Sequence, residues 1–153
     1  MGKGRIEIFK SDNKDHLELL NKFIKENKSI NLDMSKILGN ESDDIEINDY
    51  LLYIIDNQIK DICYVNSLKD IKMSTISLPI DSPKNKKILI YATNYAIDIL
   101  GMKQIFIKTS ENDQRTQEFL EEQGYENLGI EKGNIIFLKE VYEDFKKSST
   151  NNL

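Results

Sequence analysis

Four segments of the chain carry hydrophobic patterns that are typical of strands, and alternation between hydrophobic and polar positions is weak in the first and clear in the last. They span residues 5–9, 50–55, 59–66 and 72–80. Asp56-Asn57 lies between the second and third segments and favours a tight turn. The short spacers between the last three segments predict an antiparallel meander.

Hydrophobic residues recur with a helical period in three other segments. These span about residues 13–27, 88–100 and 113–123. Asp12 is the expected N-cap of the first helix, and Gly101 is the expected left-handed residue beyond the second. Because the second helix is apolar on most sides, we expect it to be packed into the core.

The remaining pattern completes an α/β (α+β) fold. A strand over residues 104–108 follows the second helix in a βαβ-like arrangement. Residues 125–130 and 134–139 flank Lys132-Gly133 and predict a closing hairpin. We therefore expect a mixed, mostly antiparallel central sheet with helices on both faces.

The chain shows no internal repeat or linker, so residues 1–142 are predicted to form a single domain and residues 143–153 a polar tail. Residues 34–38 favour one short helical turn. The segment that follows is acidic, with Glu41, Asp43, Asp44, Glu46 and Asp49. It could attract an amine or a basic peptide by long-range charge, and a solvated flexible loop is the alternative.

The net charge narrows the classes of partner. It is −5 over 153 residues, whereas a protein that binds nucleic acid usually carries an excess of Lys and Arg. The longest apolar run, residues 51–55, is too short to span a bilayer, and residues 1–10 lack the pattern of a secretory signal. We expect neither a nucleic acid nor a membrane as partner.

The chain has one cysteine, Cys63, and one histidine, His16. No intrachain disulfide can form, which fits a reducing compartment and a cytoplasmic location. We expect no metal site. Cys63 is interpreted as a small core residue, and His16 as a surface or partly buried residue beside the apolar face of the first helix.

Three lysines lie at the start of the second helix. Ser82 is a suitable N-cap and Pro83 a suitable first residue. Lys84, Lys86 and Lys87 then lie at the positive end of the helix dipole, which is unfavourable unless an anion is near. Together with the N–H groups of the first turn they favour a phosphate site; a solvated loop in a lysine-rich chain is the alternative.

Residues 92–129, ATNYAIDILGMKQIFIKTSENDQRTQEFLEEQGYENLG, resemble the C-terminal motif of the GNAT N-acetyltransferases. A buried helix ends at Gly101, a strand follows, and Asn112-Asp113 opens a helix that ends in Gly124-Tyr125, where the family has Gly-Phe. The resemblance covers about residues 72–140. The first 70 residues agree only in the order of their elements.

This resemblance implies acetyl-CoA as co-substrate, bound between two parallel strands with its pyrophosphate at the next helix. The residues it assigns to that site are Leu78, Ile80, Ser82, Lys84, Asn85, Lys86, Lys87 and Asn112. The family loop has Gln or Arg, Gly, and Gly or Ala where this chain has Asp81, Lys84 and Lys86. Leu120 stands where many members have a Tyr that serves as general acid.

The resemblance implies an N-acetyltransferase that acts on a small-molecule or peptide amine. The departures in the loop and at Leu120 keep open an inactive GNAT-like module with a binding or regulatory role. A third hypothesis is a site for another anion at the lysines. No catalytic residue is assigned, since nothing in the sequence places Asp56 or Asp61 at the site, and the oligomeric state stays open, with a homodimer as one alternative.

Overall fold

The computed structural model describes residues 4–27, 46–78 and 87–141. The expected turn at 34–38, the tail at 143–153 and residues 41–45 of the acidic segment lie outside these ranges. The elements are β1 (Arg5–Ile8), α1 (Lys14–Glu26), β2 (Glu46–Ile55), β3 (Gln58–Leu68), β4 (Met73–Ser77), α3 (Lys87–Asn94), η1 (Tyr95–Ile99), β5 (Gln104–Ser110), α4 (Gln114–Glu122), β6 (Glu126–Glu131) and β7 (Asn134–Glu140). None of the helices within these ranges is long and apolar enough to cross a bilayer.

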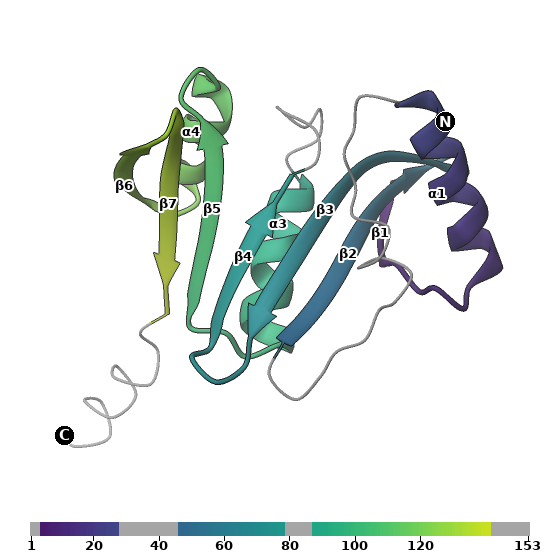
Figure 1. Ribbon diagram of the computed structural model, residues 1–153, viewed down its shortest axis with the longest axis horizontal. Helices are drawn as coiled ribbons and strands as arrows, with labels where there is room; N and C mark the ends of the chain where they lie inside the picture. Colours follow the sequence, from purple (N-terminus) through teal and green to yellow (C-terminus); the bar gives the residue numbers. More distant parts are fainter. Residues whose placement is uncertain (1–3, 28–45, 79–86, 142–153) are drawn as a thin grey trace.

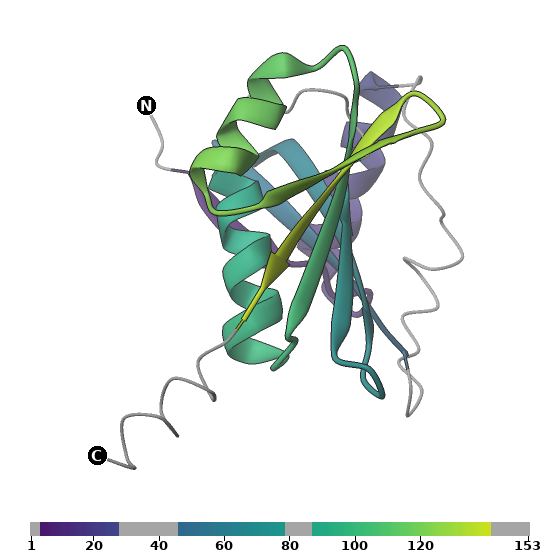
Figure 2. The same cartoon turned by 90° about the vertical axis from the view of Figure 1, so that its left-hand side faces the viewer.

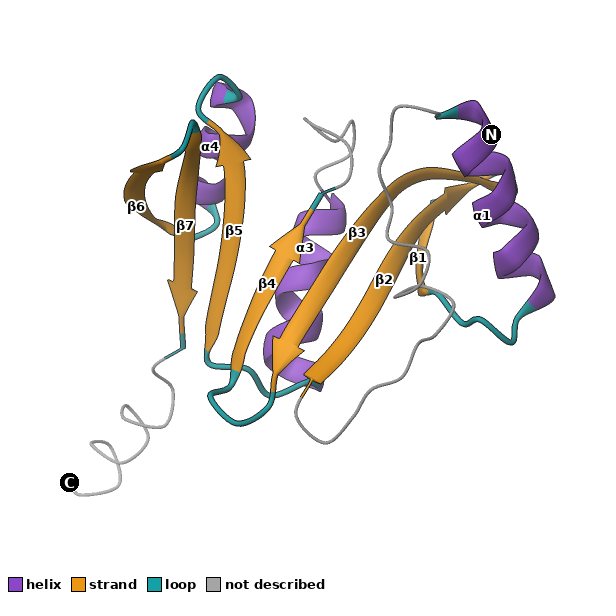
Figure 3. Cartoon of the chain, in the orientation of Figure 1, coloured by secondary structure: helices purple, strands orange, loops and turns teal. Residues whose placement is uncertain are grey.

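The described strands form one sheet in the order β1-β2-β3-β4-β5-β7-β6 (Figure 1). The first four strands are an antiparallel meander. β4 pairs with β5 in parallel, and β7 joins β5 and β6 through antiparallel pairs. The prediction of a mixed, mostly antiparallel sheet is confirmed, and Figure 3 shows the strands as one layer with α1 and α3 against it.

Both predicted hairpin turns are present. Asp56 and Asn57 have φ angles of 51° and 60°, and Lys132 and Gly133 have φ angles of 52° and 82°. Two consecutive left-handed residues make the turn whose twist matches that of the flanking strands. Two boundaries differ by several residues. β2 begins at Glu46 and not at residue 50, because the polar start of the strand pairs with β3, and β4 ends at Ser77, short of the predicted residue 80.

Helices cover both faces of the sheet, and each face has its own hydrophobic core. Against one face, α1 packs Leu20 and Phe23 onto residues of β2 and β3. Against the other, α3 and α4 enclose the larger core, which contains Cys63 and Phe137 (Figure 2). Cys63 is fully buried, so its interpretation as a core residue is confirmed, and burial raises the pKa of its thiol.

The long helix after β4 does not keep one geometry. Its second half, η1, is π-helical: the Leu100 N–H donates to the Tyr95 carbonyl at 3.1 Å. Gly101 then takes a φ of 72°, as predicted for the residue that ends the helix. The expectation that the helix is packed into the core is only partly right, since Tyr91 and Ile99 are 43% and 72% exposed.

The N-cap of α1 is Asn13, and the prediction of Asp12 is wrong. The Asn13 side chain accepts a hydrogen bond from the His16 N–H at 3.1 Å. His16 is 5% exposed; its Nδ1 accepts from the Lys10 N–H at 3.0 Å and its Nε2 lies 2.8 Å from a Glu7 oxygen. The histidine therefore fastens the start of α1 to β1, and with Arg5 it lowers the pKa of Glu7.

We predict that Asn13→Ala lowers the free energy of unfolding by about 1 kcal/mol, because it removes the acceptor that caps α1. Asp12→Ala is the matched control, with an expected change below about 0.5 kcal/mol, typical of surface substitutions. Urea unfolding followed by circular dichroism measures both. Equal losses for the two variants would show that Asn13 is not the cap.

Candidate functional site

β4 and β5 run side by side and then part. Their parallel register ends with the pair Ile76 and Ile107. Beyond this point β4 stays with β3, through Tyr64 opposite Ser77, while β5 stays with β7 to its last residue. Figure 1 shows the two strands diverging toward the edge at which both end. The sheet is therefore split between two strands that each keep their other neighbour.

Two helices begin at the edge toward which the strands diverge. β4 runs toward this edge and α3 starts there at Lys87; β5 ends there at Ser110, and α4 starts four residues later (Figure 1). Each helix N-terminus carries a partial positive charge and N–H groups without helical partners. Two such ends beside a split between strands favour the binding of an extended anionic ligand.

Three of the predicted site residues lie in the described part of the chain, and all three are at this edge. Leu78 follows β4 and packs against the larger core. Lys87 is the exposed first residue of α3. Asn112 is exposed in the turn after β5, where its N–H donates to the Ser110 hydroxyl at 3.2 Å. The other predicted residues, Ile80, Ser82, Lys84, Asn85 and Lys86, lie outside the described residues.

The residue that opens α4 is Asp113 and not Asn112. One Asp113 carboxylate oxygen accepts from the Thr116 N–H at 3.2 Å and the other from the Thr116 hydroxyl at 2.7 Å. Asp113 therefore occupies the capping position that the resemblance assigned to the Asn112-Asp113 pair, and Asn112 lies one residue outside the helix.

Thr109 places a polar atom beside the split. It is 6% exposed on β5, two residues beyond the last pair with β4. Its Oγ1 is buried and has no hydrogen-bond partner among the described residues. A buried hydroxyl without a hydrogen bond is unfavourable. A ligand group that forms a hydrogen bond with this atom would therefore bind more favourably.

A polar cluster lies on the face of the sheet opposite α3. The Asn66 side-chain amide donates to a Glu46 oxygen at 2.5 Å and to the Asn48 oxygen at 2.7 Å. The Tyr64 hydroxyl also donates to Asn48, and its ring stacks on Tyr50 with ring centroids 4.7 Å apart. We call Glu46, Asn48, Tyr64 and Asn66 the polar cluster.

The polar cluster adjoins the strand that borders the split. Tyr64 and Asn66 are the register partners of Ser77 and Thr75 on β4, and partners in a pair share one face of the sheet. The sequence reasoning missed this cluster. Its signal was a polar residue at every second position in two neighbouring strands, but only the register shows that Asn48 is opposite Asn66.

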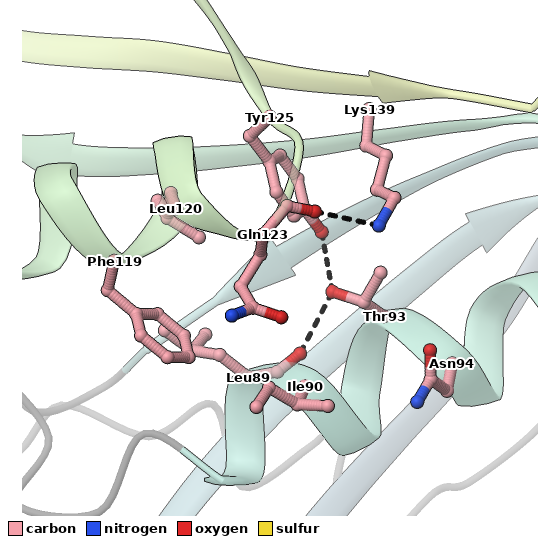
Figure 4. Close-up of a pocket in the computed structure, with 9 residues that line it drawn as sticks. All are labelled: Leu89, Ile90, Thr93, Asn94, Phe119, Leu120, Gln123, Tyr125 and Lys139. Carbon is pink, nitrogen blue, oxygen red and sulfur yellow. Dashed lines mark hydrogen bonds between the residues drawn. The ribbon is translucent and has the colours of Figure 1, made fainter.

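Leu120, where the resemblance places a general acid, is fully buried in the larger core. It also lines a small pocket between α3 and α4, near Tyr125 (Figure 4). There the Tyr125 hydroxyl lies 2.5 Å from the Thr93 hydroxyl, and the Lys139 amino group donates to the Gln123 carbonyl at 2.8 Å. The cavity measures about 20 Å³, room for about one water molecule, so it cannot hold a substrate.

Asp61 is a buried carboxyl on the α3 face of β3. It is 1% exposed and lies opposite Tyr53 of the larger core. One oxygen accepts from the Ile62 N–H at 2.9 Å, and the other has no partner among the described residues. Burial raises the pKa of Asp61 from 3.8 to about 6, against the smaller effect of that hydrogen bond. The polar cluster lies on the opposite face, so Asp61 is not part of it.

In the described ranges, no group of three or more His, Cys, Asp or Glu side chains is arranged to hold a metal ion.

The fold is shared with known N-acetyltransferases. The structure matches the Campylobacter jejuni N-acetyltransferase PseH, solved in complex with acetyl coenzyme A, with a TM-score of 0.64 over 92% of this chain and 100% of that one, at 14% identity. It matches the spermidine N-acetyltransferase of Vibrio cholerae with a TM-score of 0.68 over 95% and 98% of the two chains, at 10% identity.

A third match is the PaiA N-acetyltransferase of Thermoplasma acidophilum, solved with coenzyme A, with a TM-score of 0.57 over 90% and 99% of the chains, at 13% identity. No protein-family model and no curated protein matches the sequence. The comparisons establish the GNAT fold over nine-tenths of the chain. At such identities they leave the activity and the substrate to be argued from the site.

Asp61 predicts a pH dependence of stability. Its pKa is higher in the folded chain than the ordinary 3.8, so the folded state holds the proton more tightly and loses stability as the pH rises from about 4 to about 7. A shift of about two units corresponds to a loss on the order of 3 kcal/mol.

The pH-dependent part of this loss should disappear in Asp61→Asn, whatever constant offset the new amide adds. Urea unfolding of the wild type and the variant between pH 4 and pH 8 measures the difference in slope. Asp70→Asn, at the exposed turn between β3 and β4, should keep the wild-type slope. If Asp61→Asn keeps it as well, the buried carboxyl is not the cause.

Proposed function

We propose that this chain, which has the GNAT fold, is an acetyl-CoA-dependent N-acetyltransferase that acts on a small-molecule or peptide amine. The observation that carries the proposal is the split between β4 and β5, with two helix N-termini at its open edge. Solved N-acetyltransferases with the same fold contain acetyl coenzyme A or coenzyme A, which supports the choice of co-substrate.

The residues around the split fit the parts of acetyl-CoA. Its pantetheine arm carries amides that could pair with the backbone of β4, and Leu78 and Ile80, which follow β4 in the sequence, are the proposed contacts. The Thr109 hydroxyl is buried and has no hydrogen-bond partner among the described residues, so a ligand group that reaches it would supply one. Asn112 lies in the turn at the same edge and could hydrogen-bond the arm.

The pyrophosphate would bind where α3 begins. The proposed contacts are Ser82, Lys84, Asn85, Lys86 and Lys87. The N–H groups of the first turn and the helix dipole attract the phosphates. The lysines add charge in place of the glycines that the family has in this loop, so binding here relies more on charge than on close approach of the backbone.

Acetyl-CoA supplies an activated acetyl group as a thioester. Transfer forms a bond from the amine nitrogen to the carbonyl carbon and breaks the bond from that carbon to sulfur. Backbone N–H groups of β4 would stabilise the charge that develops on the carbonyl oxygen, and most of the acceleration would come from holding the two substrates together. Because Leu120 provides no proton, water or another group would accept the proton from the amine and donate one to the leaving thiolate.

The acceptor amine is proposed to bind at the polar cluster. The cluster presents a carboxylate, two amides and a phenol one strand away from β4. A carboxylate and amide oxygens accept hydrogen bonds from an amine or hydroxyl group. The cluster therefore favours a polar acceptor that carries several donors over an apolar one.

The second candidate is an inactive module that binds acetyl-CoA without turning it over. The burial of Leu120 in the core favours it, since the side chain at this position cannot take part in proton transfer. Calorimetry together with a screen of amines separates the two functions. Binding with turnover supports the enzyme, binding without turnover supports the module, and no binding at millimolar acetyl-CoA contradicts both.

We predict that replacing Lys84, Lys86 and Lys87 with Ala weakens acetyl-CoA binding by about tenfold or more, because charged hydrogen bonds to phosphate are lost. Binding of S-acetylpantetheine, which lacks the pyrophosphate, should stay unchanged. Calorimetric titration measures both ligands.

The matched control replaces Lys22 and Lys25 of α1 and Lys60 of β3, which are exposed, with Ala. It changes the net charge equally and should leave both affinities intact. An equal loss in the control would mean that the effect is one of overall charge and not of a site at α3.

We predict that Asn66→Ala raises the KM for the best amine of the screen by about tenfold, with an unchanged Kd for acetyl-CoA, since the variant removes a donor that holds Glu46 and Asn48 in place. Asn21→Ala, on the exposed side of α1, is the control. Steady-state kinetics gives both constants. An unchanged KM would remove the polar cluster from the acceptor site.

A further inference from the structure

An open groove lies on the outer side of the helix that α3 and η1 form together. Its volume is about 230 Å³, and it is lined by Tyr91, Asn94, Tyr95, Asp98 and Ile99. Sites for drug-sized ligands are usually larger than about 300 Å³. The groove is therefore suited to a small molecule or a single side chain, and it is too small for a coenzyme.

The chemistry of the lining favours a cation with an apolar body. Tyr91 and Tyr95 offer aromatic rings, whose faces attract ammonium groups. Asp98 is exposed and supplies the opposite charge, and Ile99, 72% exposed, supplies apolar surface. The five lining residues include no Lys or Arg.

Tyr95 is held in place before any ligand arrives. Its hydroxyl donates to a carboxylate oxygen of Asp49 on β2 at 2.7 Å. Burial raises the pKa of Tyr95, and the bond to Asp49 raises it further, so the phenol stays a donor. A ring that is fixed in advance loses little entropy on binding, and the Asp49 carboxylate behind it adds negative potential.

The groove also lies at the favourable end of its helix. η1 is the last part of the helix, and its carbonyl groups and dipole give this end a partial negative charge. The end of the helix is π-helical, with the Leu100 N–H bonded to the Tyr95 carbonyl, and its last residue, Ile99, is exposed. π-helical turns occur frequently at functional sites.

We propose that this groove binds a small alkylammonium ion, with the charged head between Tyr91, Tyr95 and Asp98 and the alkyl part against Ile99. The site lies on the face of the sheet opposite the polar cluster, so it is separate from the proposed acceptor site. It does not depend on acetyl transfer, and it can be tested on the protein without acetyl-CoA.

The test is a titration of the full chain, labelled at isoleucine methyl groups, with choline and with its neutral isostere 3,3-dimethylbutan-1-ol. We expect choline to shift the Ile99 methyl signal, assigned with Ile99→Leu, in a saturable way at millimolar concentration, and the isostere to bind at least fivefold more weakly. Equal affinity for the two compounds, or no shift, would overturn the proposal.

Two variants locate the site. Tyr91→Leu and Asp98→Asn should each weaken choline binding at least threefold. Asp15→Asn, at an exposed position of α1 on the other face of the sheet, should leave it unchanged. An Asp98→Asn variant that binds choline as the wild type does would contradict the proposal. So would a signal that depends on protein concentration alone, since that would assign the surface to a second copy of the chain.

Discussion

The architecture of the proposed site depends on the separation of β4 from β5, since each of these strands stays paired with a different neighbour. β4 is bonded to β3 up to Ser77, and β5 is bonded to β7 up to Ser110, so each strand follows a different partner once their shared register ends at Ile76 and Ile107. Their buried side chains anchor both strands in one core. The sheet can therefore open at one edge without losing its continuity at the other.

The distribution of charge around this split supports its proposed use. Two helix N-termini lie at the edge toward which the strands diverge, and Lys87 stands at one of them. This is an environment in which an anion is stabilised. The opposite end of the same helix presents tyrosines and an aspartate, so one continuous helix offers an electropositive start and an electronegative finish.

The larger core encloses a carboxyl group whose hydrogen bonds are not all satisfied by the described residues. Asp61 is enclosed with one carboxylate oxygen unpaired, and a buried charge without a partner is costly. The compensation is a raised pKa, so the group is more easily neutralised than a surface aspartate. The buried polar side chain of His16 is instead satisfied by hydrogen bonds, since its two ring nitrogens are bonded to the Lys10 N–H and to a Glu7 oxygen.

The sequence by itself determined most of the fold. Periodicity gave the strands and helices, Asp56-Asn57 and Lys132-Gly133 gave two hairpin turns, and the motif from residue 92 to residue 129 gave the fold family. These signals are local, because side-chain spacing and backbone preference act over a few residues. Local reasoning erred by one residue at Asp12, where the adjacent Asn13 caps the helix, and it did not decide which residue of Asn112-Asp113 caps α4.

Only the tertiary structure decided which residues of different strands and helices contact one another. Register placed Asn48 opposite Asn66 and so assembled the polar cluster, and packing against β2 brought Tyr95 to Asp49 across 46 positions of the chain. Tertiary structure also separated β4 from β5 beyond Ile76 and Ile107. Such contacts join residues far apart in sequence, and their free energy depends on how whole elements pack, which the pattern of any one segment does not contain.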